Sequence, residues 1–329
     1  MEPIYTFGLE ATRWLQATLP QLEGFFKVIT SMGEENFYLV ILPLIYWCLD
    51  KRLGKNLVYL FLLADGVNVL GKHAFRGPRP FWLDPSVGLS QSEGYGVPSG
   101  HTQLTTVIYG LVAVWYKRAW LTWLAVFMIV AMGLSRIYLG VHFVHDVVAG
   151  FLIGLIILIS YFAWRRYSGG RFDKLFLGRK LFWAVIIPLG LAVAYVIARL
   201  IIGDPNTAVP WAKFIPDAEL NGLEGMATAI GTLLGFGIGV NLEASRTRFL
   251  VAGPIWQRAV RYVLGLVVTL VIYLGLRAVF PADPLWLGVP LRILRYMLLT
   301  LWMSYYGPAL FVKLGLASAN PEPEIKVAL

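Results

Sequence analysis

Uninterrupted apolar segments constrain this chain more than any other feature of its sequence. Of its 329 residues, 58% are hydrophobic and only 14% are charged, whereas soluble domains contain about 25% charged residues. Apolar runs long enough for a bilayer recur along most of the sequence. Lipid offers no hydrogen-bond partners, so each run must form a helix or belong to a closed barrel. Because the runs are continuous rather than alternating, the sequence predicts an all-α fold, a polytopic transmembrane helix bundle.

We expect about nine spans joined by polar connections. Before them, leucines and phenylalanines at helical spacing alternate with charged residues, which predicts amphipathic helices at the interface or packed against the bundle. The tail is polar, and we expect it to be loosely held. The expected domains are interfacial helices (1–34), a helical core (35–166), additional transmembrane helices (167–316) and the tail (317–329). The expected spans are 37–49, 57–70, 101–117, 120–134, 147–164, 181–202, 222–240, 262–280 and 291–311.

Positive charge predicts the orientation of these spans. Lys and Arg are concentrated in loops that alternate onto one side, at 50–55, 117–118, 165–180 and 242–261. The positive-inside rule places that side in the cytoplasm. The net charge of +9 is thus a topology signal, and without a soluble basic face we expect no nucleic-acid partner. We expect a multi-pass protein of the cell (plasma) membrane of a prokaryote; whether it forms a homodimer is left open.

The seventh expected span carries glycines four residues apart. Gly231, Gly235 and Gly239 share one helix face. Small residues on one face let a neighbouring helix backbone approach closely. We therefore expect a packing role for this face rather than a substrate path.

Three polar motifs lie at the ends of expected spans two to five. The first is Lys72-x6-Arg79-Pro80, the second is Pro98-Ser99-Gly100-His101, and the third joins Ser135-Arg136 to His142 and Asp146. The predicted topology places all three on the extracytoplasmic side. Cations that break the positive-inside rule need another explanation, and binding an anion is the obvious one.

A phosphate ester fits this set of residues. A phosphate monoester carries a charge of about −1.5 to −2 at neutral pH, and electrostatic clamping of its oxygens is the main help a protein can give. Lys72, Arg79 and Arg136 supply positive charge, and arginine matches phosphate geometry with two parallel donors. Ser99 adds a hydroxyl, while the backbone N–H groups of Gly100 and His101 open a helix, itself an anion site.

The histidines supply the remaining chemistry. His142 and Asp146 are four residues apart and share a helix face. The carboxylate can therefore hold Nδ1–H and leave Nε2 free to attack phosphorus. His101 could protonate the departing oxygen. The hypothesis is a phosphohistidine on His142 that water hydrolyses with His101 as base, and it requires no metal and no cofactor.

Two other site chemistries use the same residues. His142, His145 and Asp146 could be metal ligands, but the surrounding cations would repel a metal ion. Ser99, His142 and Asp146 could form a hydrolase triad, but the surplus of arginine suits phosphate better than an acyl group.

Simpler structural roles account for the remaining polar and aromatic residues near the motifs. A single cation at a helix end is usually a snorkelling anchor, and single histidines are usually satisfied polar residues. Aromatic residues in a connecting loop are candidates for interfacial anchors. The cations are Arg76, Lys213 and Arg277, the histidines are His73 and His145, and the aromatic residues are Phe81, Trp82 and Tyr95.

The order and inner spacing of the three motifs resemble the type-2 phosphatidic acid phosphatase superfamily, which includes lipid phosphate phosphatases, glucose-6-phosphatase and vanadium haloperoxidases. The resemblance covers about residues 57–160 and implies the helical core of the acid phosphatase and vanadium haloperoxidase type. It implies His142 as nucleophile, His101 as general acid and Asp146 as orienting partner. The phosphate binders that it implies, without a metal, are Lys72, Arg79, Ser99, Gly100 and Arg136.

Two further features bear on the branch of the family. The stretch Gly33–Tyr38, with Pro43 and Trp47, is similar to the sphingosine-1-phosphate phosphatase branch. The spans after about residue 180 exceed the usual six-span core and are closer in number to glucose-6-phosphatase.

These features predict an integral membrane phosphatase. Its expected substrate is a lipid or polyprenyl phosphate monoester, or a diphosphate, entering from the bilayer. A lipid phosphotransferase of the same family is one alternative. A phosphate or lipid transporter that binds without hydrolysis is another, although it would leave the His–Asp pair idle.

Overall fold

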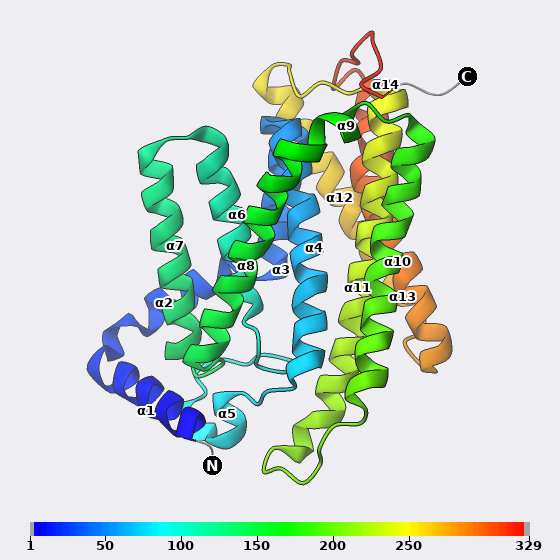
Figure 1. The fold of residues 1–329 in the computed structure, drawn as a ribbon. Coiled ribbons are helices and arrows are strands. Elements are labelled where there is room, and N and C mark those ends of the chain that lie inside the picture. The colour runs from blue at the N-terminus through cyan, green and yellow to red at the C-terminus, as the bar shows by residue number, and fades with distance from the viewer. Residues whose placement is uncertain (1–2, 326–329) are drawn as a thin grey trace. The chain divides into compact units, whose positions relative to one another are not determined.

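The computed structural model describes residues 3–325, and its regular elements in that range are helices, apart from one isolated bridge between Phe249 and Ala319 (Figure 1). The predicted all-α class is therefore confirmed. The α-helices are α1 (Pro3–Thr18), α2 (Glu23–Ser31), α3 (Glu35–Leu44), α4 (Lys51–Phe75), α5 (Pro80–Leu83), α6 (Gly100–Tyr116), α7 (Ala119–Tyr138), α8 (Val144–Trp164), α9 (Gly170–Asp173), α10 (Leu177–Ile202), α11 (Ile215–Leu242), α12 (Ile255–Val279), α13 (Leu285–Leu301) and α14 (Gly307–Lys313).

Many of these helices are long and apolar enough to cross a bilayer. Seven described helical segments meet that description, and an eighth does if the bent pair Pro20–Ser31 and Glu35–Leu49 forms one span. Helix α6 has 17 residues, which is at the short end of the range for a span. The chain is an integral, multi-pass membrane protein, and the count of about nine spans remains a prediction.

The chain divides into two compact units, each assembled from segments far apart in the sequence. The first unit comprises Met1–Tyr38, Ala64–Ser160 and Ala194–Leu223. The second comprises Leu39–Leu63, Tyr161–Val193 and Glu224–Leu329. All the residues of the three motifs belong to the first unit.

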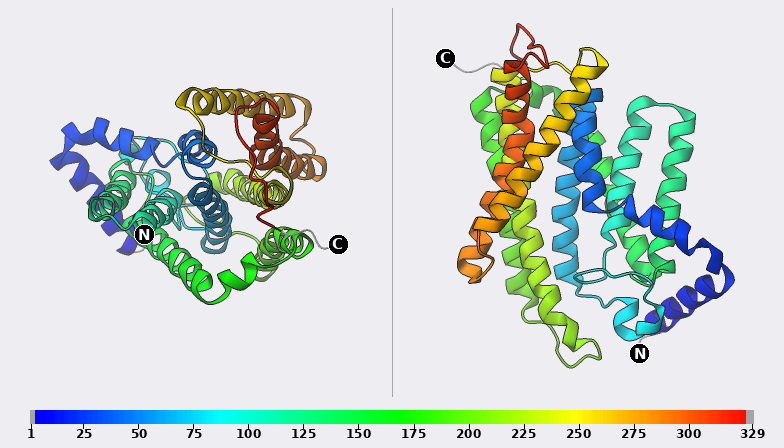
Figure 2. Two further views of the ribbon diagram at one scale, coloured as in Figure 1. Left: turned by 90° about the horizontal axis from the view of Figure 1, so that it is seen from above. Right: turned by 180° about the vertical axis from the view of Figure 1, so that it is seen from behind.

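In the first unit, α6 and α7 pack side by side and the N-terminal helices lie against α7 (Figures 1 and 2). Phe26 of α2 contacts Tyr138 at the end of α7, with ring centroids 4.6 Å apart. Ile29 packs with Met128 and Met132 further along α7. The apolar face of α2 is thus buried against α7, which favours packing against the bundle for this helix.

Helix α8 packs closely against α6 because a glycine allows it. A Cβ atom added to Gly154 would lie 2.7 Å from the backbone oxygen of Gln103, and one added to Gly110 would lie 2.6 Å from Leu158. Both contacts are shorter than real Cβ contacts, so larger residues would separate the helices. This packing fixes the ends of α6 and α8, where two of the motifs lie.

In the second unit, the glycine face of α11 packs closely against α13, as its spacing predicts. Added Cβ atoms at Gly231 and Gly235 would lie 2.4 Å and 2.1 Å from the backbone oxygens of Ile293 and Met297 in α13. Gly239 faces the side-chain hydroxyl of Ser304, just beyond the end of α13. The expected packing role of this glycine face is confirmed.

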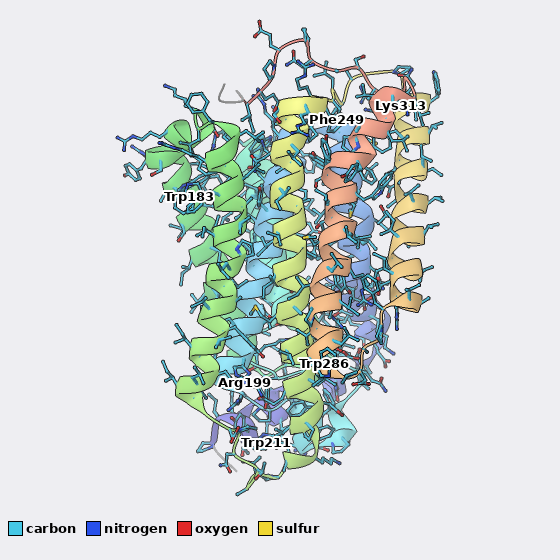
Figure 3. All side chains as sticks on the ribbon, turned by 90° about the vertical axis from the view of Figure 1, so that its right-hand side faces the viewer. Trp183, Arg199, Trp211, Phe249, Trp286 and Lys313 are labelled. Atoms are coloured by element: carbon cyan, nitrogen blue, oxygen red, sulfur yellow. The ribbon has the colours of Figure 1, made fainter. Side chains whose placement is uncertain are left out.

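The expectation of a loosely held tail is wrong for the part that the structure describes. Backbone N–H groups of Leu250 and Asn320 donate to the carbonyls of Ser318 and Arg248, and the Glu324 N–H donates to Ala244. Ile325 is buried beside Leu177. Figure 3 labels Phe249 and Lys313 at this end of the second unit. Backbone pairing, which the side-chain composition does not reveal, holds the tail in place.

The expected interfacial anchors are also buried. Trp82 and Tyr95 are only 7% and 3% exposed and form a cluster with Ala218. The Trp82 ring stacks on Phe214, with centroids 4.9 Å apart. Phe81 packs at the edge of the same cluster. These aromatic residues attach the loop after α4 to the start of α11, so the anchor interpretation is wrong for Trp82 and Tyr95.

Candidate active site

Buried amides position the N-terminus of α6, which carries the second motif. Asn68 of α4 donates through Nδ2 to the Pro98 carbonyl (3.2 Å) and to Oε1 of Gln103 (2.9 Å). Gln103 donates in turn to the Ala64 carbonyl at 2.7 Å. These buried groups satisfy one another, so α4 and the start of α6 are held at fixed positions.

The same N-terminus is attached to the start of α8. The backbone N–H of Ser99 donates to the Asp146 carbonyl at 2.9 Å. An added Cβ at Gly150 would lie 2.4 Å from the Ser99 oxygen, so only glycine permits this approach. The Ser99 hydroxyl is buried and accepts a hydrogen bond from Thr102 at 3.1 Å. Because the Ser99 side chain does not cap α6, the N–H groups that open the helix remain available to an anion.

The buried carboxylate of Asp146 holds the His142 ring. Its Oδ2 lies 3.2 Å from His142 Nδ1 and accepts the Phe143 N–H at 2.9 Å. Its Oδ1 lies 3.1 Å from Nε2 of His145, whose ring stacks on Phe143. His142 and Asp146 are 1% and 0% exposed. This arrangement favours the tautomer with a proton on Nδ1 and a lone pair on Nε2.

Arg79 is buried beside that lone pair. Its Nη1 lies 3.3 Å from His142 Nε2 and donates to the Val141 carbonyl at 2.9 Å. Its Nε and Nη2 donate to the carbonyls of Gly94 (2.7 Å) and Glu93 (2.5 Å). Most of its five N–H donors are therefore used within the protein. Arg79 both fixes the loop around the site and brings positive charge to the ring of His142.

Arg136, at the end of α7, is 3% exposed. Its Nη1 donates to Thr30 Oγ1 of α2, and its Nη2 donates to Ser92 Oγ at 3.3 Å. Its Nε has no hydrogen-bond partner within the described residues. Arg136 therefore keeps a donor that is available to an anion.

His101 lies under the turn between α2 and α3. An added Cβ at Gly33 would lie 2.7 Å from Cδ2 of the His101 ring and 2.8 Å from Cε of Met132. Among the described residues, none forms a hydrogen bond with the buried Nε2 of His101. Gly33 thus limits where the ring can lie, and the ring has a nitrogen left for a ligand.

Charge and burial keep the His142 imidazole neutral. Burial, followed by the nearby cations of Arg79, Arg136 and Lys72 and the ring of His101, holds the pKa of His142 well below its usual range. A neutral ring at physiological pH can act as a nucleophile, whereas a protonated one cannot.

The pKa of His142 gives a prediction that is independent of turnover. The chain has four histidines, so ¹⁵N imidazole spectra of wild-type and His142→Gln protein would assign the His142 signal by its loss. We expect this ring to titrate clearly below pH 6.5, the value of an unperturbed histidine. Below pH 6.5 the unfolded chain would bind a proton that the folded chain does not, so acid should lower stability. A midpoint at or above 6.5 would contradict the electrostatic account.

The structure brings the three motifs together in one buried site of the first unit. Arg79 of the first motif lies 3.3 Å from His142 Nε2 of the third, and Ser99 of the second is joined through its backbone to Asp146. Within the described residues Ser99 makes no hydrogen bond to His142, so the geometry does not support a serine triad. No group of three His, Cys, Asp or Glu side chains in residues 3–325 could hold a metal ion.

Sequence reasoning missed several groups that complete this site. The interpretation of His145 as a satisfied polar residue fits the structure, but its partner, the second oxygen of Asp146, was not foreseen. Thr30 and Ser92 bind Arg136 from distant parts of the chain. The interpretation of Arg76 as a snorkelling anchor is wrong, since its Nε lies 2.8 Å from Oε1 of Glu219. A carboxylate 143 positions away gives no local signal that would have revealed this ion pair.

Comparisons with known proteins identify the family of the stretch that carries the motifs. The family model described as "PAP2 superfamily" matches residues 53–170, which include all three motifs. A second model, "PAP2 superfamily phosphatase, transmembrane extension", matches residues 227–319. No solved structure matches the chain.

Several curated phosphatases are similar to the chain. Glucose-6-phosphatase 3 of Bos taurus is 26% identical over 345 aligned positions, covering 92% of each chain. Glucose-6-phosphatase catalytic subunit 1 of Rattus norvegicus is 28% identical, over 48% of this chain and 52% of its own. Sphingosine-1-phosphate phosphatase 2 of Homo sapiens is 32% identical, over 42% and 37%. The latter two matches thus span only about half, or less, of those relatives. With both family models, these similarities show that the chain belongs to the type-2 phosphatidic acid phosphatase superfamily and is a phosphoric ester hydrolase.

Proposed function

We propose that this protein hydrolyses a lipid or polyprenyl phosphate monoester, or a diphosphate, through a phosphohistidine on His142. The observation that carries this proposal is the position of the His142 ring. Its Nδ1 lies 3.2 Å from the carboxylate of Asp146, and its Nε2 lies 3.3 Å from the guanidinium of Arg79. We assign the catalytic core to residues 35–166, the interfacial helices to 1–34, the additional helices to 167–316 and the tail to 317–329.

In the first step, Nε2 of His142 attacks phosphorus and the bond from phosphorus to the ester oxygen breaks. His101 gives its proton to that oxygen, so the alcohol leaves neutral. In the second step, His101 takes a proton from water, the water oxygen attacks phosphorus, and the N–P bond breaks to release phosphate. Lys72, Arg79 and Arg136, with the Ser99 hydroxyl and the N–H groups of Gly100 and His101, stabilise the equatorial oxygens.

Two observations support a lipid phosphate as the substrate. The site is built from the ends of membrane helices, which suits an ester whose alcohol is an apolar chain. One relative is named as a phosphatase of sphingosine 1-phosphate. A sugar phosphate is a second candidate, because the similarity to glucose-6-phosphatase 3 extends over 92% of the chain.

A phosphate-release screen on purified protein would test the function and separate the candidates. The substrates are phosphatidate, a lysophospholipid, a sphingoid phosphate, a polyprenyl phosphate and glucose 6-phosphate, each with and without EDTA, with His142→Ala protein as blank. We expect release from a lipid phosphate that vanadate inhibits. A phosphorylated product formed on an added acceptor lipid would indicate the phosphotransferase. Binding without release from any substrate would contradict the proposal and favour the transporter.

Gly33→Ala tests the position that we assign to His101. The added methyl would overlap the His101 ring, and a misplacement of about 1 Å can cost about 100-fold in rate. We expect kcat to fall by about 10- to 100-fold with a smaller change in KM, measured on the best substrate of the screen. Gly24→Ala in α2 is the matched control, since an added Cβ there meets nothing within 4 Å. Equal activity of the two variants would refute this placement of the ring.

We also propose that the site faces the extracytoplasmic side, as the basic loops indicate. The single cysteine, Cys48, is buried, and a Cys48→Ser background would make introduced cysteines unique. Gln91, in the loop of the site, and Ser168, in the basic helical turn Arg165–Gly169, are both exposed. In intact bacterial cells, a membrane-impermeant maleimide should label Gln91→Cys but not Ser168→Cys until the cells are lysed. The reverse pattern would place the site in the cytoplasm.

A further inference from the structure

We infer that Glu219, together with Asn221, is a positioning residue that holds the loop Glu93–Val97 against the active site and thereby fixes Arg79. This inference rests on the proposed function of the site. Glu219 lies in the first turns of α11, between the two matched ranges 53–170 and 227–319. Neither family pattern therefore assigns it a role, and none of the three motifs contains it.

Glu219 connects the loop to the end of α4. Its Oε1 accepts a hydrogen bond from the Tyr95 hydroxyl at 2.8 Å and lies 2.8 Å from Nε of Arg76. Its Oε2 lies 3.6 Å from Nδ1 of His73. The Glu219 side chain is 15% exposed, so these interactions are poorly screened by solvent. The Tyr95 ring, which carries the hydroxyl bound to Glu219, packs in turn with Trp82 and Ala218.

Asn221, two residues further along α11, holds the same loop at a second point. Its Nδ2 donates to the Glu93 carboxylate at 3.1 Å. An added Cβ at Gly94 would lie 2.5 Å from Asn221 Oδ1, and Gly94 has φ +69°, where a side chain is disfavoured. Glycine therefore lets the backbone of the loop approach α11 closely. Trp211, labelled in Figure 3, lies in the segment that leads into this helix.

The inner side of the loop contacts the catalytic residues. The carbonyls of Glu93 and Gly94 accept two of the hydrogen bonds that hold Arg79. An added Cβ at Gly96 would lie 3.0 Å from Oδ2 of Asp146. The loop thus has α11 on its outer side and both partners of His142 on its inner side. Displacing its outer side should move the Arg79 guanidinium relative to His142 Nε2.

Glu219→Gln and Tyr95→Phe test this inference, with Glu224→Gln as matched control. Glu224 lies five positions further along α11 and pairs with Arg292 at 2.8 Å, so the control also loses an Arg–Glu ion pair by the same substitution. Two readouts are used: the ¹⁵N shift of His142 Nε2, which needs no turnover, and kcat at a temperature well below every thermal midpoint.

We expect the His142 Nε2 signal to move in Glu219→Gln and Tyr95→Phe protein but not in Glu224→Gln protein. We also expect kcat to fall by about tenfold in each of the first two variants. The double variant should be no slower than Glu219→Gln, because both changes break the same link. Thermal midpoints should be similar in Glu219→Gln and Glu224→Gln.

An unmoved His142 signal, together with an unchanged kcat, would overturn the inference, even if Glu219→Gln lowered the thermal midpoint. Additive losses in the double variant would also overturn it. If wild-type protein released phosphate from no substrate, the proposed function would fail, while the His142 signal would still decide whether Glu219 positions the loop.

Discussion

Replacing His142 with alanine should reduce phosphate release by about 10⁴-fold or more in kcat, because the variant has no nucleophile. The buried ring has one nitrogen held by Asp146 and the other aimed at the cations. The cations alone would still bind phosphate, so KM should change far less than kcat. Initial rates on the best substrate of the screen measure both constants.

The variant must fold for this result to count. His142→Gln keeps a polar side chain beside Arg79 and should lose activity equally. Thermal unfolding and a single symmetric elution peak in detergent would show that both variants are intact. Turnover within tenfold of wild type in either folded variant would rule out attack by His142.

Asp146→Asn should reduce kcat by about 10³- to 10⁴-fold while leaving the packing of the site almost unchanged. The carboxylate accepts the Phe143 N–H and faces Nδ1 of His142 and Nε2 of His145. An amide that presents its NH₂ group to His142 Nδ1 favours the opposite tautomer with a proton on Nε2, and it gives up the Phe143 N–H bond because one oxygen serves both groups. That ring cannot attack phosphorus. The substitution changes the tautomer of His142 but leaves the phosphate-binding cations in place, so kcat should fall much more than KM rises.

His145→Gln is the comparison for Asp146→Asn. The His145 ring acts on His142 only through Asp146, so we expect a loss of about tenfold or less. ¹⁵N spectra of His142 would report the tautomer directly in both variants. If Asp146→Asn protein kept the Nδ1-protonated form, or lost less than tenfold in kcat, the orienting role of the carboxylate would be wrong.

The sequence predicted the motifs better than their surroundings. The four-residue spacing paired His142 with Asp146 correctly, but not through the shared helix face that it predicts, because α8 begins at Val144 and His142 lies in the turn before it. No comparable spacing rule predicts which residues of the loops contact the motifs. Arg79 is held by backbone carbonyls, and every residue has one, so its partners leave no trace in the sequence. For Arg136, the partner Thr30 is 106 positions away, a distance at which spacing carries no information.

The positions of the aromatic residues and of the tail could not be predicted from their composition. Trp82 and Tyr95 have the composition of interfacial anchors, yet the start of α11 covers them. The described part of the tail is polar, yet its backbone pairs with Arg248 and Leu250. Tertiary contacts between segments far apart in the chain decided both cases, and hydropathy does not report such contacts.

The most direct test of the account is to trap the phosphoenzyme. Wild-type protein would be mixed with ³²P-labelled substrate, quenched with base within milliseconds and digested, and the labelled peptide identified by mass spectrometry. We predict a base-stable, acid-labile label on His142 that forms no slower than turnover and is absent from His142→Ala protein. Phosphate release at the normal rate with no label on His142, or with a label on another residue, would contradict the account.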